Sequence, residues 1–159
     1  MNADSLRAIL SYDSDTGVFT WLADKGRAYA GDIAGSQRRD RYIIIGLNGK
    51  PYRAHRLAWL YVYGEFPQEI DHINGDPSDN RLVNLRSATR AQNVANTKKK
   101  KNSGNLLKGV TPARDSRYKA QIRVQGKNTY LGTFATEQDA HVAYCKAAEK
   151  EFGAYHSAG

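Results

Sequence analysis

The chain has 159 residues, of which 40% are hydrophobic and 25% charged, a balance typical of folded proteins rather than disordered ones. Its length allows one domain or two small ones. The 24 basic and 16 acidic residues leave a net charge of +8, and residues 98–159, with 12 basic and 5 acidic residues, carry most of it. Such a field attracts polyanions and favours nucleic acid as a partner, with a merely solvated basic surface as the alternative.

Cys145 is the only cysteine, which excludes an internal disulfide and any zinc cluster built on cysteines. Residues 1–7 lack the basic-then-apolar pattern of a secretion signal, and no apolar run approaches the roughly 18 residues of a membrane span. We therefore expect a cytoplasmic protein in a reducing compartment, with no membrane contact.

The N-terminal part predicts a small antiparallel sheet. Residues 13–17 are turn formers that lead into a strand at residues 18–21. A second strand at residues 42–47 runs into Asn48-Gly49, the strongest short hairpin signal, and returns through residues 50–54.

The next segment predicts a helix and then a strand pair. The apolar pattern of residues 55–63 indicates a buried helix that stops at Gly64. Residues 69–73 are short enough for a strand, residues 74–80 are rich in turn formers, and residues 82–86 can form the returning strand.

A helix that carries Gln92, Asn93 and Asn96 follows, and either Ser87 or Thr89 can cap it. This order places His72 at the end of one strand, Asn84 on the facing strand, and Asn93 one turn into the helix. The three side chains can then meet in one cleft.

The lysine run at residues 98–101 continues into a polar stretch without an apolar anchor. Such a segment repels itself into an extended linker, which is either a plain tether or a strip that follows a phosphate backbone. We expect a first domain at residues 1–97, a basic linker at residues 98–106 and a second domain at residues 107–159.

The second domain predicts three strands backed by one helix. In residues 117–124 apolar and polar side chains alternate, a turn follows at residues 125–128, and residues 129–134 return antiparallel. Residues 106–112 can supply the third strand. Thr136 and Asp139 resemble a capping box that opens an alanine-rich helix ending at Gly153, and the exposed basic sheet face can enter a DNA major groove.

The residue types of Asp71, His72, Asn84 and Asn93 suit metal-assisted hydrolysis of a phosphodiester. The Asp71 carboxylate and the Asn93 amide oxygen are ligands that Mg²⁺ accepts, with room left for water and phosphate. Neutral imidazole at His72 can take a proton from water, and Asn84 can hold that ring by a hydrogen bond. The plainer alternative is that the segment from Asp71 to Asn80 only makes turns. A calcium loop is excluded, because Ile73 stands at the third position and glycine comes one residue early.

This set resembles the HNH nucleases, in particular the homing-endonuclease branch found with mobile introns and phages. The resemblance implies a ββα-metal fold with His72 as general base, Asp71 and Asn93 as metal ligands, and Asn84 as the residue that steadies the catalytic loop. His55 is expected beside the site and not in it. Asn93 stands where many relatives carry histidine, which favours an oxygen-preferring metal, Mg²⁺ or Mn²⁺. The matching residues are His55-Arg56-Leu57-Ala58-Trp59, Asp71-His72-Ile73-Asn74-Gly75-Asp76, Asp79-Asn80-Arg81, Asn84-Leu85-Arg86 and Gln92-Asn93.

The second domain resembles the AP2 DNA-binding domain. The resemblance rests on Gly109-Val110, Tyr118-Lys119-Ala120-Gln121-Ile122, Tyr130-Leu131-Gly132-Thr133-Phe134 and the alanine-rich helix. It implies that the sheet contacts DNA while the helix only supports it, and that arginine reads guanine while Lys119 and Lys127 hold phosphates. The expected DNA-binding residues are Arg114, Arg117, Lys119, Gln121, Arg123, Lys127 and Tyr130.

Together these patterns predict an α+β protein that acts as a monomeric endonuclease dependent on Mg²⁺ or Mn²⁺. Its substrate is double-stranded DNA, its products carry 5′-phosphate and 3′-hydroxyl ends, and one active site implies nicking. No obligatory protein partner is inferred, and a phage-encoded enzyme would act in the host cell cytoplasm. The alternatives are a DNA-binding regulator with an inactive nuclease scaffold, and an RNA-directed protein.

Overall fold

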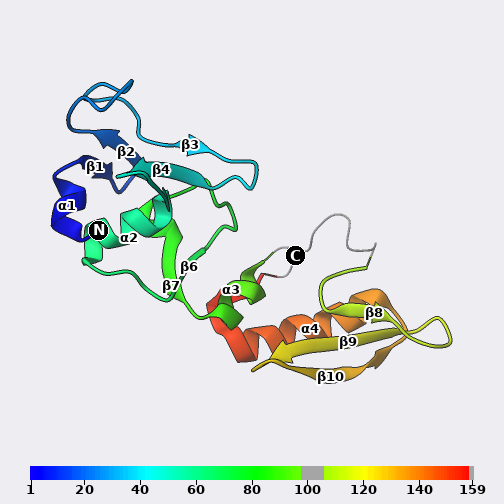
Figure 1. The fold of residues 1–159 in the computed structure, drawn as a ribbon. Helices are drawn as coiled ribbons and strands as arrows, with labels where there is room; N and C mark the ends of the chain where they lie inside the picture. The colour runs from blue at the N-terminus through cyan, green and yellow to red at the C-terminus, as the bar shows by residue number, and fades with distance from the viewer. Residues whose placement is uncertain (98–105, 158–159) are drawn as a thin grey trace. The chain divides into compact units, whose positions relative to one another are not determined.

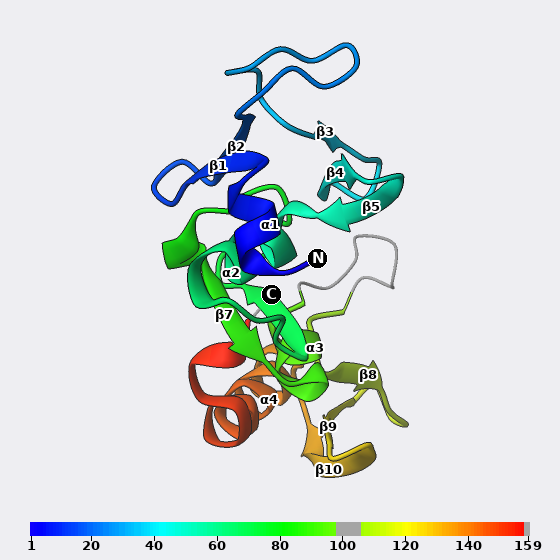
Figure 2. The same cartoon turned by 60° about the vertical axis from the view of Figure 1, so that its left-hand side comes forward.

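The computed structural model describes residues 1–97 and 106–157, so the expected linker, apart from Leu106, lies outside the described residues. The chain divides into two compact units, Met1–Ala88 and Thr89–Gly159. Figures 1 and 2 show small antiparallel sheets and helices in both units, which confirms the mixed α and β class. Each unit is described by itself.

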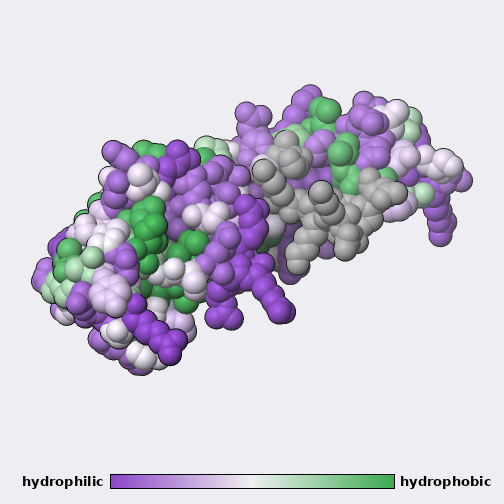
Figure 3. Space-filling view, turned by 90° about the horizontal axis from the view of Figure 1, so that it is seen from above, coloured by the Kyte–Doolittle hydropathy of each residue, from purple (hydrophilic) through white to green (hydrophobic). Residues whose placement is uncertain are grey.

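The surface is mainly polar on the face drawn in Figure 3, where apolar side chains form small separate patches. Within the part of the chain that the structure describes, no helix is both long and apolar enough to cross a membrane.

The first unit begins with a short helix and a hairpin. Helix α1 (Ala3–Arg7) is followed by β1 (Leu10–Asp13) and β2 (Val18–Trp21), which pair antiparallel in direct register. The turn between them closes where the Gly17 amide donates to the Asp13 carbonyl at 2.8 Å. The sequence predicted β2 and this turn, whereas β1 and α1 were not expected.

The second sheet of this unit has strands β3 (Ser36–Gln37), β4 (Ile43–Leu47) and β5 (Lys50–Arg53). Leu47 pairs directly with Lys50, so the connection is the two-residue loop Asn48-Gly49. Both loop residues have positive φ, 51° and 74°, as a type I′ turn requires. The predicted hairpin is confirmed, and its first strand begins one residue later than expected.

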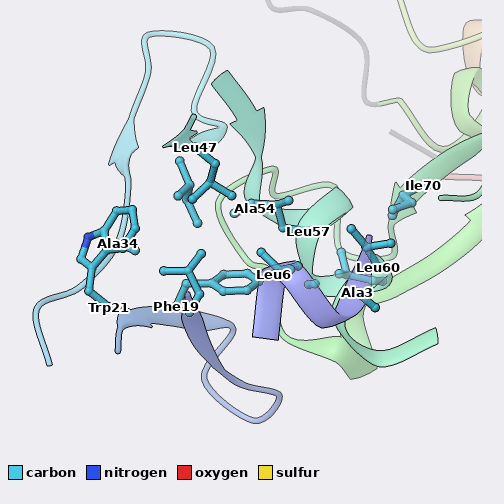
Figure 4. Packing of buried hydrophobic residues seen from close by; sticks show 14 residues of the cluster. Ala3, Leu6, Phe19, Trp21, Ala34, Leu47, Ala54, Leu57, Leu60 and Ile70 are labelled. Atoms are coloured by element: carbon cyan, nitrogen blue, oxygen red, sulfur yellow. The ribbon is translucent and has the colours of Figure 1, made fainter. Parts of the chain in front are cut away.

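Helix α2 (Ala54–Tyr63) ends at Gly64, whose φ of 81° terminates the helix in the left-handed region. It packs against α1, β4 and β5, and its apolar face completes the core shown in Figure 4. The predicted helix is confirmed. The largest fully buried side chains of this core are Leu6, Leu10, Phe19, Ile45, Leu47 and Leu57.

Strand β6 (Glu69–His72) pairs antiparallel with β7 (Leu85–Ala88), and a 3-10 helix, η1 (Leu82–Asn84), precedes β7. The prediction of a strand from residue 82 to residue 86 is therefore wrong at its start. Asn84 lies in the 3-10 turn instead of on the facing strand. In this turn the side-chain amide of Asn84 bonds the backbone of the loop before it, at Asn74 and Asp79, which a period-two strand pattern does not foresee.

The second unit begins with helix α3 (Arg90–Asn96), which Thr89 caps in a full capping box with Gln92. Of the two caps that the sequence allowed, the structure selects Thr89. Asn93 lies one turn into this helix, as predicted.

Helix α3 belongs to the second compact unit, which begins at Thr89, whereas the expected bound of the first domain is residue 97. The expected functional domains stay a prediction. The half-buried ammonium of Lys108 donates to the Ala95 carbonyl at 2.5 Å and to the Ser157 carbonyl at 3.1 Å. The Ser157 amide also donates to Ala95, at 3.2 Å. These bonds connect the end of α3 to the segment before β8 and to the segment after η2, which chain composition does not indicate.

Three antiparallel strands form the sheet of this unit in the order β10 (Lys127–Phe134), β9 (Tyr118–Val124) and β8 (Val110–Pro112). The predicted sheet is confirmed, with two corrections to its ends. The first strand covers three residues of the expected 106–112. The turn is Gln125-Gly126 alone, with φ of 49° and 79°, because Lys127 pairs directly with Val124.

Helix α4 (Glu137–Phe152) covers one face of this sheet (Figure 1) and ends at Gly153, followed by a short 3-10 helix, η2 (Gly153–Tyr155). Thr136 caps it by accepting the Asp139 amide at 3.1 Å, as predicted. Its small-residue face packs on the sheet. The buried positions on that face are Ala140, Tyr144 and Ala148.

Gly109 and Gly126 form a natural pair for testing this packing, because their φ values, 78° and 79°, are nearly equal. A Cβ at Gly109 would lie 2.1 Å from the Tyr144 ring, whereas a Cβ at Gly126 would meet nothing within 4 Å. We expect Gly126→Ala to cost about 1 kcal/mol, the penalty of a left-handed alanine. Gly109→Ala should cost about 3 kcal/mol, because overpacking adds to that penalty. Urea unfolding measures both, and equal midpoints for the two variants would contradict the packing described.

Candidate functional site

Asp71 and His72 end strand β6 and are both buried, with 3% and 6% of their surface exposed. The strand register places Arg86 directly opposite Asp71. The guanidinium contacts the Asp71 Oδ2 atom through Nε at 2.7 Å and through Nη2 at 2.6 Å. A buried carboxylate is costly without a paired cation, and Arg86 supplies a cation to Asp71.

The His72 imidazole lies among other rings. The His55 ring meets it edge-on with 4.9 Å between centroids, and the Tyr42 ring lies 6.1 Å away. Burial lowers the pKa of His72, and this effect outweighs the opposite influence of the Asn80 side chain and of Asp71. His72 is therefore neutral at physiological pH, the state in which an imidazole can accept a proton.

His55, at the first turn of α2, is 5% exposed, and its Nδ1 atom makes no hydrogen bond with the described residues. Burial, with a smaller contribution from His72, lowers the pKa of His55 to about 3. His55 therefore contacts the expected base as a neutral ring. Its expected place beside the catalytic residues stays a prediction.

The loop from Ile73 to Asn84, here called the site loop, is closed by the side chain of Asn84. The Oδ1 atom of Asn84 accepts the Asn74 amide at 3.0 Å, and its Nδ2 atom donates to the Asp79 carbonyl at 2.9 Å. Neither bond reaches the imidazole. The geometry is that of a residue that steadies the loop, and the hydrogen bond from Asn84 to His72 that the spacing suggested is not present in this arrangement.

Two further arginines neutralise the site loop. Arg41, from the turn before β4, contacts Asp76 at 2.9 Å, and Arg81 contacts Asp79 at 2.6 Å. The hydrogen bond from Arg81 is the main reason that the pKa of Asp79 falls to about 2. Many polar residues of the loop therefore make turns, as the alternative interpretation of the segment from Asp71 to Asn80 predicted.

Asn93 lies on α3 in the second unit and is partly buried. Its backbone N–H donates to the Thr89 carbonyl, and its backbone carbonyl accepts the Thr97 hydroxyl at 3.1 Å. Its role as a metal ligand stays a prediction. Among residues 1–97 and 106–157, no group of three or more His, Cys, Asp or Glu side chains is placed to hold a metal ion.

The sequence patterns did not indicate the roles of Arg86, Asn80 and Tyr42. Arg86 and Asn80 both lay within the matched motifs, but only the strand register shows that Arg86 faces Asp71. Asn80 is 3% exposed, and its side chain raises the pKa of His72 against the effect of burial. Tyr42 directly precedes β4, which belongs to a different sheet, and no spacing in the sequence indicated that it approaches the imidazole.

The second unit presents a polar sheet face on the side opposite α4. Gln121 pairs with Tyr130 across the strands, and Lys119 pairs with Thr133, so these side chains share one face. The Lys119 ammonium lies 5.8 Å from the centre of the Tyr130 ring. This face holds four of the seven expected DNA-binding residues, namely Lys119, Gln121, Arg123 and Tyr130.

The other three expected residues lie at the strand ends. Arg114 and Arg117 form the turn before β9, where the Arg117 amide donates to the Arg114 carbonyl at 3.2 Å, and Lys127 begins β10. All three are exposed. Beside the sheet, a hollow of about 310 Å³ is lined by Arg123 and by Arg90 of α3. Arg90 is a cation that the sequence argument did not include.

Comparison with known proteins places residues 52–95 in the HNH endonuclease family. Over 104 residues the chain is 33% identical to an uncharacterized HNH endonuclease of Acanthamoeba polyphaga mimivirus, covering 64% of this chain and 54% of that protein. It is 31% identical over 126 residues to the AP2-like ethylene-responsive transcription factor ANT of Arabidopsis thaliana, covering 73% of this chain and 22% of the plant protein. Protein 3.8 of Escherichia phage T7 is 32% identical over 81 residues, covering 49% of this chain and 67% of the phage protein.

A solved structure titled "DNA binding and cleavage by the HNH homing endonuclease I-HmuI" aligns with a TM-score of 0.44 and 23% identity, covering 59% of this chain and 54% of that one. The chain spans about half of the mimivirus protein and about a fifth of the plant factor.

The buried, neutral His55 predicts a pH dependence of stability in metal-free protein. The unfolded chain takes up this proton near pH 6.5, whereas the folded protein does so only near pH 3. The stabilisation is therefore complete above pH 6.5 and is lost as the pH falls toward 3. Between pH 6.5 and 4.5, His55→Gln should reduce the slope of the unfolding free energy against pH by about 1.4 kcal/mol per pH unit. This is the slope produced when the unfolded chain binds one more proton than the folded protein. Denaturant titrations in EDTA measure this slope, and an unchanged slope would exclude His55 as the group responsible.

Proposed function

We propose that this chain, which contains an HNH endonuclease domain at residues 52–95, is a metal-dependent endonuclease that nicks double-stranded DNA and leaves 5′-phosphate and 3′-hydroxyl ends. The observation that carries the proposal is the buried pair Asp71 and His72 at the end of β6. An imidazole kept neutral beside a carboxylate is the acid–base equipment that hydrolysis of a phosphodiester needs.

His72 is the general base in this proposal. Its lowered pKa leaves the ring able to accept a proton from a water molecule at physiological pH. His55 and Tyr42 surround the ring and limit its motion, and Asn84 holds the site loop behind it. Water activated at His72 attacks the phosphorus opposite the leaving 3′-oxygen.

Asp71 and Asn93 are the proposed ligands of the divalent ion. Their donor atoms are oxygens only, which fits Mg²⁺ or Mn²⁺ better than zinc, and few protein ligands suit an ion that keeps several waters. When bound, the ion supplies positive charge to the scissile phosphate and the leaving oxygen. Arg86 orients the Asp71 carboxylate through its two contacts with Oδ2.

The second unit is proposed to hold the duplex by an AP2-like sheet. Support comes from the polar face around Lys119, Gln121 and Arg123, and from the similarity of this chain to the AP2-like plant factor. Residues 98–159 also carry most of the positive charge. Arginine on this face suits bidentate contact with guanine, while lysine suits phosphate.

Cleavage of supercoiled plasmid tests the nuclease. With Mg²⁺ or Mn²⁺ we expect a nicked product, and with EDTA none. His72→Ala should slow nicking by about 100-fold to 10,000-fold, the usual contribution of a general base.

The matched control is His156→Ala, a histidine of the second unit, which should cut like the parent. Binding without cutting under all metals would favour the regulator alternative. Undiminished activity of His72→Ala would exclude this mechanism.

DNA binding in EDTA separates recognition from cleavage. Arg123→Gln and Lys119→Gln should weaken binding and lower the slope of log affinity against log salt by about one unit for each phosphate contact removed. Lys146→Gln, an exposed lysine of α4, is the matched control because the helix lies on the opposite face of the sheet. Fluorescence anisotropy at several salt concentrations measures the slope. A slope that Lys146→Gln reduces as much as the sheet variants would contradict the assignment of the face.

A further inference from the structure

We propose that the β1–β2 hairpin is a positioning element of the nuclease site, and that Tyr12 and Gly17 hold the site loop in its catalytically competent conformation. The hairpin lies outside residues 52–95, the segment that matches the nuclease family. This inference rests on the proposed function for its catalytic consequence, although the contacts themselves do not depend on it.

The first contact is a side-chain hydrogen bond across a long stretch of sequence. The Tyr12 hydroxyl donates to the Asn80 carbonyl at 2.7 Å. The Tyr12 ring is itself held by the rings of Phe19 and Tyr61, with centroids 4.7 and 5.7 Å away. Burial raises the pKa of Tyr12, so the hydroxyl stays protonated and remains a donor. A rigid phenol thus anchors the backbone of the site loop.

The second contact is made by the turn of the hairpin. The Leu82 amide donates to the Ser14 carbonyl at 3.0 Å. Gly17 lies against the loop so closely that a Cβ would be 2.4 Å from the Arg81 nitrogen, and its φ is 75°. Glycine therefore meets two requirements here, a left-handed conformation and an approach of backbone to backbone.

These contacts act on the part of the loop that matters for the site. They hold residues 80–82, where the loop enters the 3-10 turn in which Asn84 closes it. The Asn80 side chain is buried beside His72, while its Oδ1 atom lacks a well-formed hydrogen bond within the described residues. Catalytic hydrogen bonds are often long before substrate binds and tighten in the complex. A shift of Asn80 would therefore change the hydrogen bonding of the His72 imidazole.

The hairpin contacts add to the bonds that the loop makes with itself. The Asn80 Nδ2 atom donates to the Ser78 carbonyl at 3.1 Å, and the Asn84 Nδ2 atom donates to the Asp79 carbonyl at 2.9 Å. A hollow of about 190 Å³ is lined by Val18 and Phe19 of the hairpin, by Ser78 and Asn80 of the loop, and by residues 33–37 among others, so the hairpin fixes the Asn80 backbone beside an incompletely packed region. The hairpin is therefore a positioning element and not only part of the core.

The test compares Tyr12→Phe with Tyr52→Phe in the full chain. Both tyrosines are partly buried against the same core, but only the Tyr12 hydroxyl makes a hydrogen bond among the described residues. Tyr12→Phe should lower kcat for nicking about tenfold with KM for DNA unchanged, the effect of one lost hydrogen bond on the placement of a reacting group. Tyr52→Phe should keep the parent kcat. Gly17→Ala should reduce kcat further.

Amide hydrogen exchange in metal-free protein provides a readout independent of cleavage. Tyr12→Phe should speed exchange of residues 74–84 about tenfold and leave α2 unchanged. Unchanged exchange in the site loop would overturn the positioning role whether or not the protein cuts DNA. Faster exchange with the parent kcat would overturn its catalytic part. A parent that cuts no DNA with any metal, with exchange responding as expected, would overturn the proposed function and the catalytic part together, and leave the contact standing.

Discussion

The ion pair between Asp71 and Arg86 is the constraint on which the site depends. Asp71 is buried at the end of β6, where a carboxylate without a paired cation is costly. Arg86 removes that cost because antiparallel pairing sets it directly opposite. A neutralised carboxylate can then stand beside a neutral imidazole, and the register of two short strands thereby determines the electrostatics of the site.

The same solution recurs around the site loop. Asp76 pairs with Arg41 from the turn before β4, and Asp79 pairs with Arg81 of the loop itself, so each acidic residue of the loop is matched by an arginine. Such pairs contribute little stability when exposed, and their value lies in holding one loop conformation. The hairpin contacts of Tyr12 and Gly17 serve the same end from the other side. The N-terminal segment is therefore tied to the site it surrounds.

In the second unit, Lys108 has a structural role. It lies within the segment 106–112 that was expected to supply the third strand, and its ammonium donates to the carbonyls of Ala95 and Ser157. Burial lowers the pKa of Lys108, which agrees with an ammonium withdrawn from water. The lysine thereby connects α3, the helix of Asn93, to the sheet that carries Lys119 and Arg123.

Local patterns in the sequence determined most elements of this protein. The Asn48-Gly49 hairpin, helix α2, the pair of β6 and a returning strand, and the sheet with α4 follow from turn chemistry, periodicity and capping, which act within a few residues. Only the tertiary structure decided that Arg86 faces Asp71, that Asn84 bonds the loop instead of the imidazole, and that α3 joins the second unit. These outcomes depend on strand register and on contacts between distant segments, such as Tyr12 with Asn80, which no short-range rule specifies.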